Sequence, residues 1–296
     1  PEGTGRSQDE ALSGPRRNPR TNGTSLLMTT VLGVHGIFQY KYHQDPGVLA
    51  EMWSTALRPA GVEPESFTLA YYAPLLHTVT AMGESALNDL TPAEQALAAD
   101  WLRQAGVPEA VAQGPLTGWV RDGFDWLIRS GRATGVTRAM ARSILAEVAT
   151  YTDPAKPEPR AAVQESVRDA IRTEQPDIIV AHSLGSVVAY ETLWASPDLT
   201  VPVLITLGSP LALPPAFYDS FVPDTARAHS RPPGVKRWTN FADVGDLVAV
   251  PKHLARHFSG IEIDRTITID AFECHKIGYY LSNEEVKESI RDGLRR

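Results

Sequence analysis

A serine stands between small residues in the segment Ala181-His182-Ser183-Leu184-Gly185. The apolar run 178–180 precedes it as a predicted strand, and residues 186–191 can continue as a helix. At the tip of such a turn the hydroxyl leaves the backbone surface, and small residues on both sides let strand and helix pass closely. This pattern favours nucleophilic attack by Ser183, with the N–H of Leu184 facing a developing oxyanion. In the alternative, Ser183 only caps the helix.

A serine hydroxyl also needs a histidine to take its proton and a carboxylate to orient that histidine. His275 follows the last predicted strand, where the base belongs if the chain order is Ser, Asp, His. The alternative role for His275 is to cap the next helix. Asp243 and Asp246 lie in one loop and are both candidates for the acid. We expect His182 to pack near the turn, because it projects from the wrong side to act as the base.

A second oxyanion donor is expected near the start of the chain. The buried strand 29–34 runs into His35-Gly36-Ile37-Phe38. A His-Gly pair at such a strand end is typical of the loop that supplies this donor, and we assign it to the N–H of Ile37, with that of Phe38 as the alternative. Phe38 is also expected to contact substrate. An ordinary glycine at a strand end is the competing interpretation.

The rest of the chain alternates predicted strands with helices. Strands are expected at 29–34, 66–72, 178–180, 201–207, 235–241 and 265–269, and helices at 46–57, 160–173 and 283–294. Asp45 and Pro46 form a cap and a first helical position. This alternation predicts an α/β fold with a mainly parallel sheet and helices on both faces. Active groups then gather at the carboxyl ends of the strands.

The alternation stops between about residues 73 and 159. Helices are expected there at 75–87, 92–104, 118–131 and 137–151, followed by the proline-rich hinge 153–159. We interpret this segment as a helical cap inserted in the α/β domain. Trp119 and Trp126 fall at helical spacing. Their face either packs on the domain beneath, or lines an acyl pocket or touches lipid, and we retain both residues as candidates for substrate binding.

Composition excludes several classes of function. The chain has 296 residues, 43 % of them hydrophobic, and a net charge of −7 with scattered basic residues, so it has no nucleic-acid footprint. No apolar run is long enough to span a bilayer. The single cysteine, Cys274, gives no sign of an oxidising compartment, and we expect a cytoplasmic protein. His253 and His257 lack a third ligand, so no metal is expected.

These motifs together resemble the α/β-hydrolase superfamily, within it the lipase-like and esterase-like serine hydrolases. The resemblance covers about residues 28–296 apart from the helical insertion, and it depends on HGIF, AHSLGS, ITLGSPL, WTNFADVGDLV and ECHKIGYY. It implies a triad of Ser183, His275 and Asp246, an acyl-enzyme and no cofactor. Asp246 is preferred to Asp243 because Leu247-Val248 after it resembles the acid's setting in such enzymes. Ala181 departs from the commonest elbow, which has glycine there.

Three functions remain open from the sequence. The first is hydrolysis of a carboxylic ester with an acyl group of moderate size. The second uses the same acyl-enzyme on a thioester or an amide, or passes the acyl group to another acceptor, as in a thioesterase, amidase or acyltransferase. The third is a non-catalytic binding protein, which the presence of all three residue types in order disfavours.

Residues 1–25 are rich in Gly, Pro, Arg, Ser and Asn without apolar periodicity, which predicts a disordered tail. Met28 directly precedes the first predicted strand, and we expect the native start to lie near it. Deletion of residues 1–25 should therefore leave the melting temperature and activity unchanged. A drop in either would show that this segment contributes to the fold.

Overall fold

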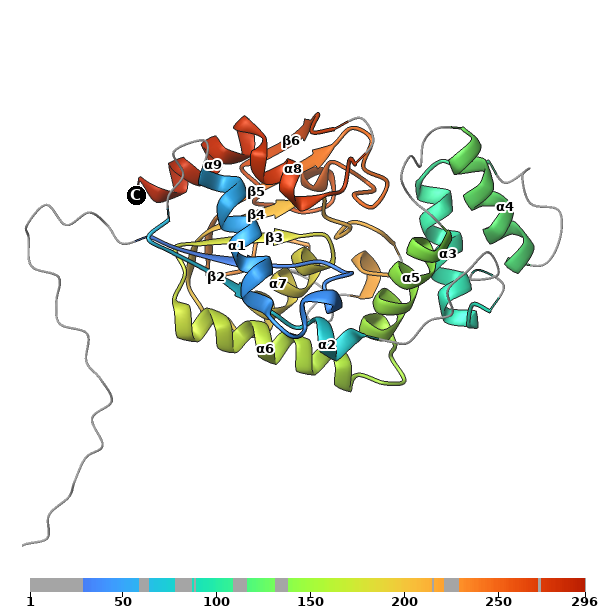
Figure 1. The fold of residues 1–296 in the computed structure, drawn as a ribbon, viewed down its shortest axis with the longest axis horizontal. Helices are drawn as coiled ribbons and strands as arrows, with labels where there is room; N and C mark the ends of the chain where they lie inside the picture. Colours follow the sequence, from blue (N-terminus) through green and yellow to red (C-terminus); the bar gives the residue numbers. More distant parts are fainter. Residues whose placement is uncertain are drawn as a thin grey trace, which may run out of the picture.

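The computed structural model describes residues 29–58, 64–77, 87, 89–108, 116–130, 138–214, 216–220, 229–270 and 273–295. Within these ranges the centre is a six-stranded, fully parallel sheet in the order β2-β1-β3-β4-β5-β6 (Figure 1). The strands are β1 (Thr30–Val34), β2 (Ser66–Ala70), β3 (Ile178–His182), β4 (Val201–Leu207), β5 (Val235–Asp243) and β6 (Ile263–Ile267). The predicted α/β class is confirmed.

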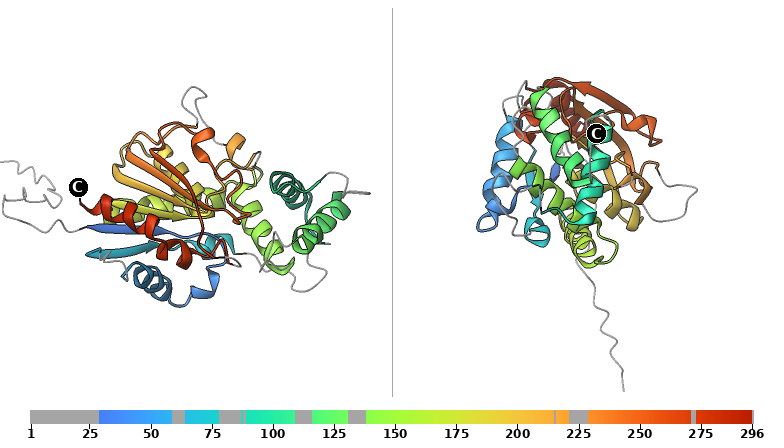
Figure 2. Two further views of the ribbon diagram at one scale, coloured as in Figure 1. Left: turned by 90° about the horizontal axis from the view of Figure 1, so that it is seen from above. Right: turned by 90° about the vertical axis from the view of Figure 1, so that its right-hand side faces the viewer.

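Helices cover both faces of the sheet (Figure 1, Figure 2). One face packs against α1 (Pro46–Leu57), α8 (Ile277–Ser282) and α9 (Glu284–Leu294), and the other against α6 (Glu158–Glu174) and α7 (Leu184–Ala195). Along β3, Ile178 and Val180 point to the first group of helices, whereas Ile179 and Ala181 point to the second. Because both faces are covered, the central strand is apolar at every one of these positions.

Four helices lie between β2 and α6 in the chain. They are α2 (Ala73–Leu76), α3 (Pro92–Gln104), α4 (Leu116–Arg129) and α5 (Arg138–Thr152). We call α3, α4 and α5 the cap; they stand together at one end of the sheet (Figure 1, Figure 2). The cap has its own apolar core, to which Leu102, Phe124 and Leu145 contribute. No helix in the described ranges has the length and apolarity needed to cross a bilayer.

Local signals set some boundaries as predicted. Helix α1 begins where Asp45 accepts a hydrogen bond from the N–H of Gly47 at 3.0 Å, with Pro46 at the first helical position. Helix α3 begins with a capping box between Thr91 and Glu94. The helices predicted at 46–57 and 92–104 are therefore confirmed, as is the strand at 201–207.

Other boundaries differ from the prediction. The helix predicted at 75–87 is wrong in its first residues: α2 covers Ala73–Leu76 and ends there, because His77 is extended. Residues 78–86 lie outside the described residues. Strand β2 ends at Ala70, since the N–H of Tyr72 donates to His35 Nε2 instead of to a neighbouring strand. The last strand, predicted at 265–269, is shifted two residues toward the N-terminus, where Asp264 binds Asn240 Nδ2 at 2.8 Å.

A buried polar cluster ties α5 and α6 to α7. Glu191 on α7 pairs with Arg160 and accepts hydrogen bonds from Tyr151 and Gln164. Only 7 % of the Glu191 side chain is exposed. The buried carboxylate is tolerated because Arg160 balances its charge and the other two side chains donate hydrogen bonds to it.

Glu191→Ala should lower the free energy of unfolding by about 3 kcal/mol, because it leaves the Arg160 charge partly buried without its partner. Asp198→Ala is the matched control: Asp198 pairs with Arg172 at 3.4 Å with 65 % of its side chain exposed, so its loss should change stability by less than about 0.5 kcal/mol. Urea unfolding measures both values. Equal, small losses for the two variants would contradict the importance of the cluster.

Candidate active site

Ser183 forms a sharp turn between β3 and α7. Its backbone angles are φ 55° and ψ −131°, a region that residues other than glycine rarely occupy. Space at the turn is minimal: a Cβ on Gly185 would overlap the carbonyl oxygens of Val34 and His35. A Cβ on Gly36 would lie 2.6 Å from the Ser183 Cβ. The glycine predicted to be needed after Ser183 therefore meets a steric demand.

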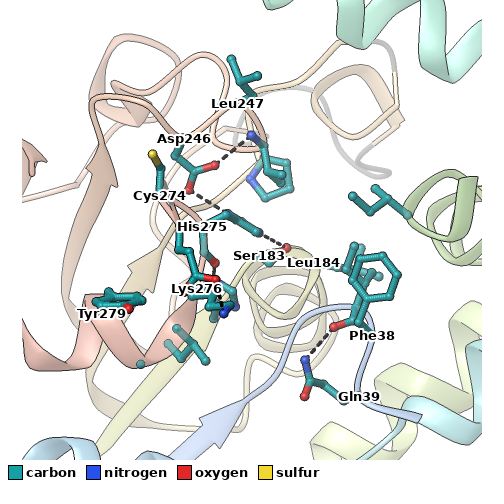
Figure 3. A pocket seen from close by; sticks show the side chains of 18 of the residues that line it. Phe38, Gln39, Ser183, Leu184, Asp246, Leu247, Cys274, His275, Lys276 and Tyr279 are labelled. Atoms are coloured by element: carbon teal, nitrogen blue, oxygen red, sulfur yellow. Dashed lines mark hydrogen bonds and ion pairs between the residues drawn. The ribbon is translucent and has the colours of Figure 1, made fainter. Parts of the chain in front are cut away.

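The structure brings Ser183, His275 and Asp246 into one chain of hydrogen bonds (Figure 3). His275 Nε2 lies 2.9 Å from Ser183 Oγ, and His275 Nδ1 lies 2.7 Å from Asp246 Oδ2. In this geometry the Nδ1–H of His275 donates to Asp246, which leaves Nε2 as the acceptor for the serine hydroxyl. The three side chains are 92 and 29 residues apart in sequence and meet only because their strands end at the same edge.

Asp246 is fully buried and held at both oxygens. The Tyr280 hydroxyl donates to Oδ2 at 2.7 Å, and the N–H of Val248 donates to Oδ1 at 2.8 Å. Burial alone raises the pKa of Asp246, but the charge of His275 and these hydrogen bonds outweigh burial and hold that pKa below its ordinary value. Asp246 therefore stays ionised beside His275.

Asp243, the other candidate for the acid, makes different contacts. It is the last residue of β5, and its carboxylate accepts from the N–H of Gly245 at 2.7 Å and from that of Ile269 at 2.8 Å. Both oxygens thus hold the loop in shape. Of the two aspartates, it is Asp246 that contacts His275.

Two further histidines near the site are buried and held neutral. Burial lowers the pKa of His182 to about 3, with the nearby charge of His275 adding to the effect, and its ring donates from Nε2 to the carbonyl of His275 at 2.9 Å. Burial lowers the pKa of His35 to about 4, although its hydrogen bond to the Gly36 carbonyl opposes the shift. These residues fix the backbone around the site and do not reach Ser183 Oγ as bases.

Two backbone N–H groups near Ser183 are candidates to bind an oxyanion. Leu184 is the first residue of α7, so its N–H has no acceptor within the helix. Gly36 touches Ser183, and Ile37 follows it directly. The N–H of Phe38 already donates to Glu147 Oε1 at 3.3 Å. Of the two predicted alternatives for the second donor, this contact favours Ile37.

A cavity of about 1060 Å³ opens over Ser183 and His275. Phe38 lines it, together with apolar side chains of the cap and of the loop after β4: Leu97, Trp101, Phe124, Ile144, Leu145, Val148, Leu213 and Phe217. Trp119 and Trp126 do not line it. They pack in the apolar core of the cap, where Arg103 lies 5.2 Å from the Trp119 ring. The prediction that this face packs on the domain beneath is therefore wrong, because both tryptophans pack inside the cap itself.

Two side chains that were not predicted hold Asp246 and its loop in place. The Tyr280 hydroxyl contacts both Asp246 Oδ2 and the N–H of Asp243. Trp101 on α3 donates from Nε1 to the carbonyl of Leu247 at 2.7 Å, so the cap touches the loop that carries Asp246. Trp101 belongs to no motif, and Tyr280 ends the segment ECHKIGYY without any local sign of its contact with Asp246, so only the packing of distant elements identifies both roles.

His253 and His257 flank a short 3-10 turn, Leu254–Arg256. His253 Nε2 lies 3.2 Å from Thr266 Oγ1, and its Nδ1 lies 3.8 Å from Asp264. Among the described residues, no three groups of metal-ligating type come together.

Comparison of the chain with protein-family models, curated proteins and solved structures finds no match in any of the three.

Asp246→Asn should lower kcat by about 10⁴-fold, since an amide at this position no longer fixes the imidazole tautomer. Asp243→Asn should reduce kcat far less and act mainly on stability, because its partners are backbone N–H groups of the loop. Steady-state kinetics together with thermal unfolding separate the two effects. The reverse ranking in kcat would assign the acid to Asp243.

Proposed function

We propose that this protein is a serine hydrolase of the α/β-hydrolase type that cleaves a carboxylic ester through an acyl-enzyme. The observation that carries this proposal is the continuous chain from Ser183 Oγ through His275 to the buried Asp246, at a strained turn facing a cavity. A serine, a base and an orienting carboxylate in this geometry form the recurring arrangement for acyl transfer. Because this fold supports many functions, the proposal depends on the geometry of the site and not on the fold.

In the proposed reaction, Ser183 Oγ attacks the ester carbonyl while His275 Nε2 takes the hydroxyl proton. The N–H groups of Leu184 and Ile37 stabilise the tetrahedral oxyanion. His275 then gives the proton to the departing alkoxide, which leaves as an alcohol. Water, deprotonated by His275, attacks the acyl-enzyme, and His275 returns that proton to Ser183 Oγ as the acyl–oxygen bond breaks and the carboxylic acid leaves. Asp246 stabilises the imidazolium in both steps and stays ionised.

The cavity favours an apolar acyl group. Its lining from the cap is aliphatic and aromatic, and such a surface binds methylene groups by removing them from water. Each methylene buried contributes about 0.8 kcal/mol, or about fourfold in kcat/KM if the contact persists in the transition state. The same three side chains can also act on a thioester or an amide, so activity assays must determine which leaving group the protein accepts.

A fluorophosphonate should label the purified protein on Ser183, located by mass spectrometry, and Ser183→Ala should prevent labelling with little effect on the melting temperature. Among p-nitrophenyl esters, kcat/KM should rise with acyl length from acetyl to octanoyl. Thioester and amide substrates complete the panel. Absence of an adduct in folded protein would contradict hydrolysis and favour a binding protein on this fold.

A further inference from the structure

The loop from His35 to Gln39 carries the proposed oxyanion donor Ile37, and hydrogen bonds from within the loop and from neighbouring segments hold it. Within the loop, His35 Nδ1 donates to the Gly36 carbonyl at 2.6 Å, and Gln39 Nε2 donates to the Ile37 carbonyl at 2.8 Å. From the residues after β2, Tyr71 donates to the Gln39 carbonyl, and Tyr72 donates to that of His35. The carbonyl groups of the loop are therefore held by donors that do not belong to the cap.

One contact with this loop comes from the cap itself. Glu147 on α5 accepts the N–H of Phe38 at 3.3 Å, across 109 residues of sequence. Phe38 has φ 64°, which is strained for an aromatic residue, so its peptide orientation needs support. Glu147 is only 8 % exposed, and in the described part of the chain no lysine or arginine pairs with it.

We propose that Glu147 is a positioning residue through which the cap orients the oxyanion loop. The inference rests on the proposed function, since it concerns the same site. A carbonyl oxygen of the protonated carboxyl is sufficient to accept the Phe38 N–H. The neighbouring N–H, that of Ile37, is thereby kept turned toward Ser183 and available to substrate.

The charge of Glu147 decides how it acts. Burial raises its pKa to about 7, although the hydrogen bond from Phe38 opposes this shift. The titratable groups that face it are the phenols of Tyr71 and Tyr72, whose own pKa values burial raises, so both are neutral at pH 7. An oxyanion forming at Ile37 adds a second negative charge close by. Like charges in a buried site disfavour each other, so ionised Glu147 opposes the transition state.

The test compares Glu147→Gln, Glu147→Leu and the control Glu288→Gln, an exposed carboxyl on α9, between pH 6 and 9 on a p-nitrophenyl ester. Wild-type and Glu288→Gln kcat/KM should decline above about pH 7, and Glu147→Gln should lack this decline. Glu147→Leu should lose at least tenfold in kcat relative to Glu147→Gln, with KM changed less than threefold. A decline that persists in Glu147→Gln, or equal kcat in the two Glu147 variants, would overturn the proposal.

A second readout needs no activity. In protein labelled with ¹⁵N-phenylalanine, which gives eight amide signals, the Phe38 signal should shift with a midpoint near pH 7 and should not titrate in Glu147→Gln. A Phe38 signal that ignores pH in the wild type overturns the inference even if Ser183 is labelled. Failure of fluorophosphonate labelling, by contrast, bears on the proposed function alone.

Discussion

The backbone of Ser183 occupies a conformation that costs on the order of 1–3 kcal/mol for a residue with a side chain, and the surrounding structure holds it there. Parallel pairing of β1 with β3 aligns Val34 with Ala181, so the ends of both strands lie side by side. Gly185 then packs against the carbonyls at the end of β1, and Gly36 packs against Ser183. The same pairing therefore places the loop from His35 to Gln39 next to Ser183. The loop that carries Asp246 lies beside both, because β5 ends at the same edge of the sheet.

Chemically similar groups around this turn differ in their contacts and in their burial. His35 and His182 are buried deeply enough to stay neutral and serve as fixed hydrogen-bonding rings, whereas the side chain of His275 is 27 % exposed and contacts Ser183. Asp243 at the end of β5 and Asp246 in the loop after it divide in the same way: Asp243 binds backbone N–H groups, and Asp246 binds the imidazole. The cap contacts both loops beside Ser183, through Trp101 to the carbonyl of Leu247 and through Glu147 to the N–H of Phe38.

Much of this arrangement could be predicted from local sequence signals, and the exceptions have physical reasons. Helices α1 and α3 begin at a capping residue followed by proline, so their starts are visible without tertiary information. Strand β6 was predicted two residues too late because Asp264 interrupts its apolar run, although that carboxylate binds Asn240 on the neighbouring strand. The tryptophans of α4 fit a helical stripe, but periodicity does not say which surface the stripe meets. Glu147 carries no motif, and its role depends on a contact between segments that only the fold brings together.

A crystal structure of the phosphonylated protein would test the central claim most directly, because it shows the nucleophile, the oxyanion donors and the acyl site in one experiment. The account predicts phosphorus bonded to Ser183 Oγ, a phosphoryl oxygen at about 2.7–3.1 Å from the N–H groups of Leu184 and Ile37, and the alkyl chain against Trp101 and Phe124 under the cap. An adduct on another residue, or a phosphoryl oxygen directed away from both N–H groups, would contradict it.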